Sequence, residues 1–309
     1  MRVLLLGASG QIGYELWRQL LPFAELVCAT RSGQLPGGGG CAVLDLADPL
    51  ALDELAAKHR PHVIINAAAY TQVDRAENEP EAAERLNHLL PARLAQLALE
   101  HCALLVHYST DYVFNGQGRT PWREDSPTQP QSVYGRSKLA GELAIVRSRC
   151  ASLILRTQWI YAARGQNFLL TMLKLAREGR SPSVVADQIG APTPASWVAA
   201  VTVAMLLRWS ARAFGISATG GMYHLSASGE VSWFDFASVL LRQAELRGLI
   251  PQAPTLHPIT TAKYGAAAPR PLWSVLDCGK LEQQFGLRLP SWRVGVDQVL
   301  TELVQHRLQ

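Results

Sequence analysis

The sequence predicts an α/β protein built around a doubly wound parallel sheet, and three observations support this. Over the first 155 residues, short apolar runs alternate with longer amphipathic stretches. This alternation is typical of βαβ units, whose strands are buried on both faces. A glycine-rich turn separates the first apolar run from the first helical pattern. With 309 residues, 48% of them hydrophobic, the chain can form one large core or two modest ones.

The expected strands are six short apolar runs, at residues 3–6, 26–29, 42–44, 63–65, 104–107 and 152–155. The expected helices are the amphipathic stretches between most of these runs. They cover residues 50–58 and 89–101, and an earlier one places Ile12, Leu16, Leu20 and Leu21 on one side. Four consecutive glycines at residues 37–40 predict a flexible turn before the third strand.

The character of the sequence changes after residue 156. Helical stretches at residues 168–178, 195–209 and 233–247 are separated by longer loops that are rich in proline. We therefore expect residues 1–155 to form the domain that contains the sheet. Residues 156–309 are expected mainly to form a smaller mixed α/β domain that covers the carboxyl ends of the strands. This division leaves open a return of segments after residue 180 to the first domain.

Charge and composition exclude several classes of function. The formal net charge of +4 is spread along the chain without a Lys/Arg-rich run, so no nucleic-acid partner is expected. The five cysteines are odd in number and show no C-x-x-C spacing, which favours the cytoplasm over an oxidising compartment. We find no signal peptide, and the longest apolar stretch, residues 197–207, is too short to span a bilayer. No membrane partner is therefore expected.

The glycine-rich turn predicts a phosphate-binding site for a dinucleotide. It reads Gly7-Ala-Ser-Gly-Gln-Ile-Gly13, with its middle glycine at Gly10. Glycine lets the backbone approach a pyrophosphate closely, and the following helix offers free amides and the positive end of its dipole. The alternative for such a glycine triplet is an ordinary tight turn between a strand and a helix.

The ends of the next three expected strands indicate the rest of a cofactor site. The second strand lacks the acidic residue that usually binds the ribose of NAD, and Arg31 can instead pair with the 2′-phosphate of NADP. NADPH is therefore the expected cofactor, with use of NADH left open. Asp45 and Leu46 end the third strand, where an adenine can rest, and Ala67 and Ala68 leave room after the fourth. The alternatives are a solvated loop arginine, a helix N-cap for the aspartate and simple packing for the alanines.

Tyr134 and Lys138 are the sharpest catalytic signal, because they lie four residues apart on one face of an expected helix. A free phenol titrates near ~10, so a neighbouring ammonium is expected to lower the pKa of Tyr134 toward the range of a general acid. Lys138 can also bind the nicotinamide ribose. Thr110, or Ser109 beside it, can hydrogen-bond the carbonyl oxygen that Tyr134 protonates. The alternative for Thr110 is a hydroxyl that satisfies the backbone at a strand end.

Other catalytic classes find little support. The eight histidines show no H-x-x-x-H or similar spacing, so metal catalysis is not expected. A hydrolase is disfavoured because G-x-S-x-G is absent and Ser132 and Ser137 have no nearby His–Asp arrangement.

Taken in order, these motifs resemble those of the extended short-chain dehydrogenases/reductases. Further segments narrow the resemblance to the dTDP-4-dehydrorhamnose reductases, over essentially the whole chain. These segments are NAAAYTQVD (residues 66–74), AE (76–77), HYSTDYVF (107–114), VYGRSKLAGE (133–142), RTQWIY (156–161), NF (167–168), DQIGAPT (187–193) and RPLWSVL (270–276).

The resemblance implies reduction of the 4-keto group of dTDP-4-dehydro-β-L-rhamnose by NADPH, the last step of dTDP-rhamnose synthesis. Tyr134 is then the general acid, Lys138 tunes it and holds the ribose, and Thr110, with Ser109, polarises the carbonyl. The implied cofactor-side residues are Gly7, Gln11, Ile12, Asp45, Leu46, Ala67, Ala68 and Tyr70. The implied substrate-side residues are Thr71, Val73, Asp111, Tyr112 and Trp159.

Trp159 and Arg270 each have a plain structural role as the alternative. Trp159 can pack against the apolar face of a deoxysugar, and the alternative is a core tryptophan. Arg270, in a proline-flanked loop, can meet the nucleotide diphosphate, and the alternative is a surface arginine.

Departures from the family pattern bear on the cofactor, the metal and the oligomer. Thr30 stands where members that use either cofactor often carry an acid, which puts use of NADH in doubt. Some members form homodimers bridged by Mg²⁺. Glu15 and Glu302 are weak candidates for that site, because Ser196 stands where a third acid is expected. Mg²⁺ and a homodimer therefore stay open.

Two alternatives to this function remain. The first is a reductase or an epimerase of another nucleotide-linked sugar, which would use the same catalytic residues. The second is a non-catalytic NADP-binding regulatory subunit, which could dispense with Tyr134 or Lys138.

Overall fold

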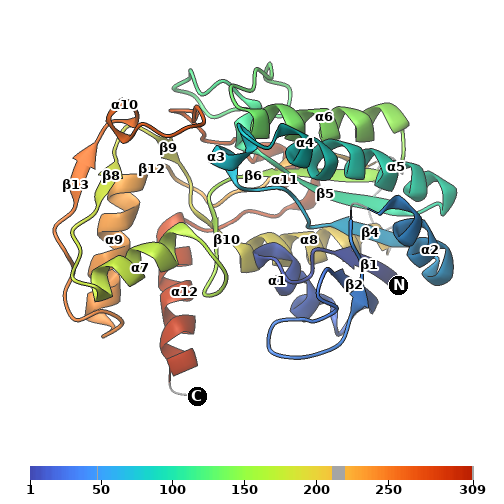
Figure 1. Ribbon diagram of the computed structural model, residues 1–309, viewed down its shortest axis with the longest axis horizontal. Coiled ribbons are helices and arrows are strands. Elements are labelled where there is room, and N and C mark those ends of the chain that lie inside the picture. The colour runs from blue at the N-terminus through green and yellow to red at the C-terminus, as the bar shows by residue number, and fades with distance from the viewer. Residues whose placement is uncertain (47, 211–219, 308–309) are drawn as a thin grey trace.

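The computed structural model describes residues 1–46, 48–210 and 220–307 (Figure 1). Within these ranges, a seven-stranded parallel sheet has the order β11-β6-β5-β4-β1-β2-β3. All six expected runs are strands of this sheet, which confirms the predicted doubly wound fold. The strands are β1 (Arg2–Leu6), β2 (Glu25–Thr30), β3 (Ala42–Val43), β4 (Val63–Asn66), β5 (Leu104–Thr110), β6 (Ser152–Thr157) and β11 (Gly220–His224).

The edge strand β11 is not predicted, because its sequence, Gly-Gly-Met-Tyr-His, contains no apolar run. It pairs with β6, with Gly220 opposite Ser152 and His224 opposite Arg156. A Cβ atom at Gly220 would lie 1.7 Å from the Ser152 carbonyl oxygen. The glycine that weakens the strand signal is therefore what allows the two backbones to approach.

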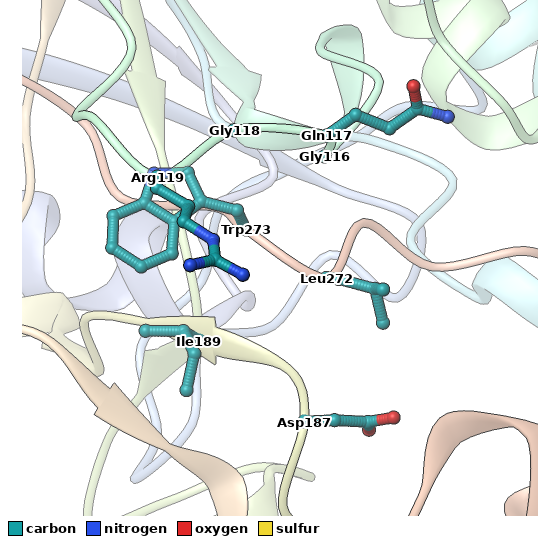
Figure 2. Close-up of a pocket in the computed structure, with 8 residues that line it drawn as sticks. All are labelled: Gly116, Gln117, Gly118, Arg119, Asp187, Ile189, Leu272 and Trp273. Atoms are coloured by element: carbon teal, nitrogen blue, oxygen red, sulfur yellow. The ribbon is translucent and has the colours of Figure 1, made fainter.

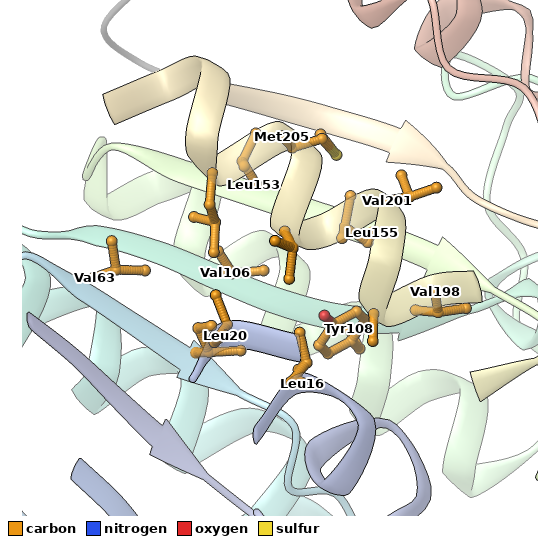
Figure 3. Close-up of a cluster of buried hydrophobic side chains, with 14 of the residues drawn as sticks. Leu16, Leu20, Val63, Val106, Tyr108, Leu153, Leu155, Val198, Val201 and Met205 are labelled. Atoms are coloured by element: carbon orange, nitrogen blue, oxygen red, sulfur yellow. The ribbon is translucent and has the colours of Figure 1, made fainter. Parts of the chain in front are cut away.

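Helices cover both faces of the sheet, since successive strand residues point to opposite sides. Val3 and Leu5 of β1 belong to one core, whereas Leu4 and Leu6 belong to the other (Figure 3 shows the first). On the first face lie α1 (Gln11–Leu20), α8 (Ala195–Ser210) and α11 (Gly279–Phe285). On the second lie α2 (Pro49–His59), α5 (Leu90–Glu100) and α6 (Val133–Ser148), with α3 (Val73–Ala76), α4 (Pro80–Glu84) and a π-helical turn (Arg85–Leu89) leading into α5.

The remaining elements form a smaller unit with its own apolar core, beside one end of the sheet (Figure 1). Leu169 and Leu173 of α7, Phe236 and Leu240 of α9 and Val296 of α12 meet in this core. The helices are α7 (Phe168–Arg177), α9 (Trp233–Leu246), α10 (Thr261–Tyr264) and α12 (Trp292–Arg307). Three two-stranded sheets pair β7 (Ile160–Tyr161) with β10 (Thr193–Pro194), β9 (Ile189–Gly190) with β12 (Val231–Ser232), and β8 (Ser183–Val185) with β13 (His257–Ile259).

The carboxyl ends of the parallel strands share one edge of the sheet, where open α/β folds place their ligands. The turn after β1, the loop after β4 and the end of β5 lie at this edge. Of the described helices, none combines the length and the apolar character that crossing a bilayer requires.

Candidate active site

The glycine turn packs directly against the loop after β4. Gly7 has a positive φ of 75°, and a Cβ atom there would lie 2.7 Å from the Ala68 amide nitrogen. A Cβ atom at Gly13 would lie 2.1 Å from the Gly7 carbonyl oxygen. Gly10 precedes α1 and offers no side-chain cap, so the first amides of the helix remain available to an anion. The turn therefore has the shape that a pyrophosphate cradle requires.

Arg164, which the motifs do not indicate, adds a positive charge at this turn. Its guanidinium donates hydrogen bonds to the carbonyl oxygens of Ser9 and Gly10, both at 3.1 Å. It also lies over the Tyr14 ring, 4.0 Å from the centroid. In the same loop, the Asn167 amide donates to Gln11 Oε1 at 2.9 Å. No local pattern signals this contact, because the loop after β7 meets the turn only through the fold.

The expected adenosine side lies at the ends of β2 and β3. Thr30 is buried, and its hydroxyl contacts the Gln34 carbonyl oxygen at 3.3 Å and Cys41 Sγ at 3.2 Å. Arg31 follows directly and is exposed, as is Asp45. The exposure of Arg31 is compatible with binding of an anionic ligand and equally with a solvated loop.

Helix α6, which carries Tyr134 and Lys138, begins beside the end of β5. The Ser132 hydroxyl accepts a hydrogen bond from the Gly135 amide at 3.1 Å and caps the helix. The Tyr134 ring meets the Tyr112 ring edge-on, with centroids 5.4 Å apart. A Cβ atom at Gly135 would lie 2.3 Å from the Tyr112 carbonyl oxygen. This close approach places the first turn of α6 beside the end of β5.

Tyr134, Thr110 and Asp111 form one hydrogen-bonded group at that end. Thr110 hydrogen-bonds with Tyr134 and donates to Asp111 Oδ1 at 3.0 Å. Asp111 is buried, which raises the pKa of its carboxyl group to about 6, while hydrogen bonds from Ser274 and Thr110 oppose the rise. The structure thus brings together the tyrosine and the threonine that the sequence proposes as partners.

The pKa of Tyr134 departs from the expected direction. Burial raises it to about 12, the hydrogen bond with Thr110 opposes the rise, and the Asp111 charge adds to it. Lys138 is not among the groups that shift it. The expected lowering by Lys138 is therefore not what the chain itself produces, because desolvation of the phenolate and the Asp111 charge together outweigh the hydrogen bond with Thr110.

Lys138 is buried behind Tyr134 and is held by β5. Its Nζ donates to the Tyr108 carbonyl oxygen at 2.6 Å and lies 3.2 Å from His107 Nε2. Burial lowers the pKa of Lys138 to about 8, and the Glu142 charge opposes that change. The amine is thus fixed between the helix and the strand.

Several expected substrate-side and cofactor-side residues already have protein partners. Arg270 forms a two-pronged ion pair with Asp74, at 3.0 and 2.6 Å, and its side chain is partly buried. Trp159 has a positive φ of 49° and stacks on Trp233, with centroids 3.7 Å apart. The Tyr70 hydroxyl donates to Glu79 Oε2 at 2.6 Å. Thr71 is exposed, Val73 opens α3, and Ile12 and Leu46 are partly buried against the two cores.

A cavity of about 640 Å³ is open to solvent and is lined by residues 116–119, Asp187, Ile189, Leu272 and Trp273, none of which is a predicted site residue. Figure 2 shows its wall, to which three separate segments contribute Arg119, Ile189 and Trp273. Backbone hydrogen bonds join the segments, from the Trp273 amide to the Gly116 carbonyl oxygen and from the Ile189 amide to the Leu272 carbonyl oxygen. The last segment continues to Ser274, whose side chain hydrogen-bonds with Asp111. The segment that lines the cavity with Leu272 and Trp273 therefore continues to a neighbour of Asp111.

The proposed Mg²⁺ ligands do not fit a cation site. The Arg18 guanidinium lies 3.7 Å from Glu15 and 3.9 Å from Glu302, so a positive charge already occupies the space near both carboxylates. The third position is Ser196, whose hydroxyl is buried and makes no hydrogen bond. Over the described ranges, no group of three or more His, Cys, Asp or Glu side chains could hold a metal ion. A hard cation needs more anionic oxygens than this cluster offers.

We accordingly expect the stability of the protein to be independent of Mg²⁺. If the cluster bound Mg²⁺, a Mg²⁺ concentration a hundredfold above the Kd would add about 2.7 kcal/mol to the free energy of unfolding. Thermal melts in buffer, with excess MgCl₂ and with EDTA should therefore superimpose. A melting temperature that rises with MgCl₂ and falls with EDTA would show that the cluster binds the ion despite Arg18.

Comparisons with known proteins agree with this geometry. The family described as the RmlD substrate binding domain matches residues 1–305. The dTDP-4-dehydrorhamnose reductase of Salmonella typhimurium is 42% identical over 304 residues and 98% of each chain. The crystal structure of such a reductase from Bacillus anthracis in complex with NADP has 32% identity, a TM-score of 0.85 and coverage of 97% and 99% of the two chains. An ortholog from Clostridium acetobutylicum has 31% identity, a TM-score of 0.86 and coverage of 98% and 99%. The chain is thus an oxidoreductase that belongs to the dTDP-4-dehydrorhamnose reductase family.

Proposed function

We propose that this protein uses NADPH to reduce the 4-keto group of dTDP-4-dehydro-β-L-rhamnose, giving dTDP-β-L-rhamnose. The proximity of the Tyr134 and Thr110 side chains, beside a glycine cradle, carries the proposal. Reduction of a ketone places negative charge on its oxygen. A tyrosine hydroxyl can protonate this oxygen as a general acid, and a second hydroxyl can stabilise it by a hydrogen bond. The curated relatives that share the whole length of the chain are named for this reaction.

The residues around the cradle fit a dinucleotide. The Gly7–Gly13 turn and the first amides of α1 would hold the pyrophosphate, with Arg164 adding a positive charge. Ala67 and Ala68 line the opposite side, and Lys138 would hold the nicotinamide ribose. When bound there, NADPH supplies the hydride. We infer that the sheet with α8, β11 and α11 forms the cofactor-binding part, and that the smaller unit forms the substrate-binding part.

Tyr134 is suited to donate the proton. With a pKa of about 12, its phenol is fully protonated at neutral pH and available to the substrate oxygen. The alkoxide that forms is about as basic as hydroxide, whose conjugate acid, water, has a pKa of roughly 15.7. Proton transfer from Tyr134 to this oxygen is therefore downhill without any lowering of the phenol pKa. Thr110 stabilises the same oxygen through its hydroxyl.

NADPH is expected to be preferred over NADH because Arg31 follows β2. Replacing Arg31 with alanine removes a charge-assisted hydrogen bond to the 2′-phosphate, worth about 1.5–3 kcal/mol. The ratio of kcat/KM for NADPH to that for NADH should then fall roughly ten- to a hundredfold. The same ratio should fall less in Arg31→Lys, which keeps the positive charge. Steady-state rates with both cofactors measure this ratio. Equal turnover with both, unchanged in Arg31→Ala, would contradict the assignment.

The substrate is tested by offering the purified protein dTDP-linked and UDP-linked 4-keto sugars with NADPH. We expect oxidation of NADPH with dTDP-4-dehydro-β-L-rhamnose and a product that NMR identifies as dTDP-β-L-rhamnose. An epimerase would change the configuration of the sugar without net consumption of NADPH. A non-catalytic subunit would bind the cofactor and show neither outcome.

A further inference from the structure

A loop of the smaller unit lies against the glycine turn that follows β1. The loop runs from Ala162 to Asn167, between β7 and α7. The Arg164 guanidinium donates to two carbonyl oxygens of the turn, and a Cβ atom at Gly165 would lie 3.4 Å from Gln11 Cγ. Asn167 Nδ2 donates to Gln11 Oε1 at 2.9 Å. Gln11, the first residue of α1, is therefore held by a side chain from the other unit.

Backbone partners fix which way the Asn167 amide points. Its Oδ1 accepts from the Leu170 amide at 3.0 Å, which caps α7, and only the oxygen can accept from an N–H group. Its Nδ2 lies 2.9 Å from the Ala162 carbonyl oxygen and 3.1 Å from that of Arg164, and only the NH₂ group can donate to a carbonyl. Turning the Asn167 amide over would therefore break each of these contacts with the backbone.

The orientation of Asn167 in turn fixes the orientation of Gln11. Because Asn167 presents its NH₂ group, Gln11 must present its oxygen, which leaves Gln11 Nε2 on the opposite side of the planar amide. Within residues 1–46, 48–210 and 220–307, Gln11 Nε2 makes no hydrogen bond with a protein acceptor. Gln11 opens α1, whose first amides have no side-chain cap and are available to an anion. An NH₂ group of fixed direction is thus left at the start of this helix.

We propose that Asn167 is a positioning residue, which holds the Gln11 side chain so that Gln11 Nε2 donates to the pyrophosphate of the dinucleotide. The inference rests on the proposed function for the identity of this anion. A hydrogen bond to a charged acceptor is stronger than one between neutral groups, and a donor that is already oriented loses less conformational entropy on binding. Asn167 acts through Gln11 and not by contact with the cofactor. The smaller unit thereby contributes to binding at the sheet.

The first test removes the group that orients Gln11. Asn167→Ser keeps a hydroxyl that can cap α7 but lacks the NH₂ group. The Gln11 side chain can then rotate, so the Kd of NADPH, measured by fluorescence titration, should rise roughly three- to tenfold, the scale of one hydrogen bond. The Kd of 2′-AMP, measured by displacement of NADPH, should stay the same, because this ligand has no pyrophosphate. A purely structural role for Asn167 would weaken the binding of both ligands.

The second test asks whether Asn167 acts through Gln11. Gln11→Met keeps the length of the side chain, removes its N–H groups and leaves the backbone contacts of Asn167 in place. This variant alone should weaken binding of NADPH about as much as Asn167→Ser does. In the double variant the second change should add little, because both changes remove the same hydrogen bond. Two losses that simply add would overturn the proposal.

NMR of the Gln11 side chain gives a third readout, which depends on neither the reaction nor the folding of Asn167→Ser. In protein labelled with ¹⁵N-glutamine, the NH₂ signals of Gln11 are those lost in Gln11→Met. These signals should shift when NADP⁺ is added and stay in place when 2′-AMP is added. NH₂ signals that NADP⁺ leaves unmoved would contradict a hydrogen bond from Gln11 to the pyrophosphate.

Asn115→Ser is the matched control. The Asn115 amide also donates to a glutamine, Gln129 Oε1 at 2.9 Å, and accepts from a backbone amide, that of Gln117, at 2.9 Å. This variant should leave the Kd of NADPH unchanged. If the unaltered protein binds no NADPH, the proposed function is wrong. If it binds NADPH and Asn167→Ser binds it equally well, only the role of Asn167 is wrong.

Discussion

Tyr134→Phe is expected to lower kcat by about 10²-fold or more. The change removes the hydroxyl that hydrogen-bonds with Thr110 and that would protonate the substrate oxygen, and the loss has the scale of a missing general acid. The ring keeps its edge-on contact with Tyr112, so the fold should persist. Binding of NADPH, measured by fluorescence titration, should change no more than a few-fold, because the cradle is untouched.

Tyr108→Phe is the matched control. It removes a hydroxyl from β5 that bonds with Thr202 of α8 in the core and that the proposed reaction does not use. This variant should lose some stability and keep most of its turnover. If Tyr134→Phe also kept most of its turnover, the proton would have to come from another group, and Asp111 would be the first to examine.

The second large effect is on stability. Arg156→Met is expected to lower the free energy of unfolding by about 3–5 kcal/mol, the cost of leaving one member of a buried ion pair without its partner. Arg156 of β6 donates to both carboxylate oxygens of Glu142, at 2.9 and 2.7 Å, and the side chains are 3% and 1% exposed. Because Glu142 lies on α6, the pair fixes the helix of Tyr134 and Lys138 to the sheet. Urea unfolding measures the loss.

The double variant Arg156→Met with Glu142→Leu distinguishes the cost of an unpaired buried charge from the cost of lost packing. Removing both charges should recover much of the stability, since no buried charge is then left without a partner. A single variant that loses less than about 1 kcal/mol, or a double variant no better than the single one, would show that the two charges are compensated in another way.

The sheet is largely predictable from sequence because its strands are buried on both faces. A continuous apolar run such as residues 63–65, between amphipathic stretches, strongly predicts a buried strand. The missed strand, β11, lies at an edge, where Gly220 is needed for close approach to Ser152 and apolar side chains are not. In β11 the glycine hides the strand from sequence-based prediction. At the turn that begins with Gly7, by contrast, the spacing of the glycines is itself the pattern that predicts the structure.

The candidate site is less predictable, because its electrostatics depend on burial. The spacing of Tyr134 and Lys138 correctly suggests a shared helix face, yet desolvation raises the pKa of Tyr134 rather than lowering it. Likewise, sequence cannot tell that Arg270 pairs with Asp74, 196 residues away, or that Arg164 meets the glycine turn. Such contacts are set by tertiary structure, and no local pattern encodes them.

Transfer of deuterium from NADPH labelled at the reactive C4 position of the nicotinamide gives the most direct test of the proposed reaction. We expect one deuterium at C4 of the sugar for each NADPH oxidised, detected by NMR of the isolated product, and none at C3 or C5. Product that carries no deuterium from the cofactor, or that has exchanged with solvent only at C3 or C5, would contradict hydride delivery to a ketone held by Tyr134 and Thr110.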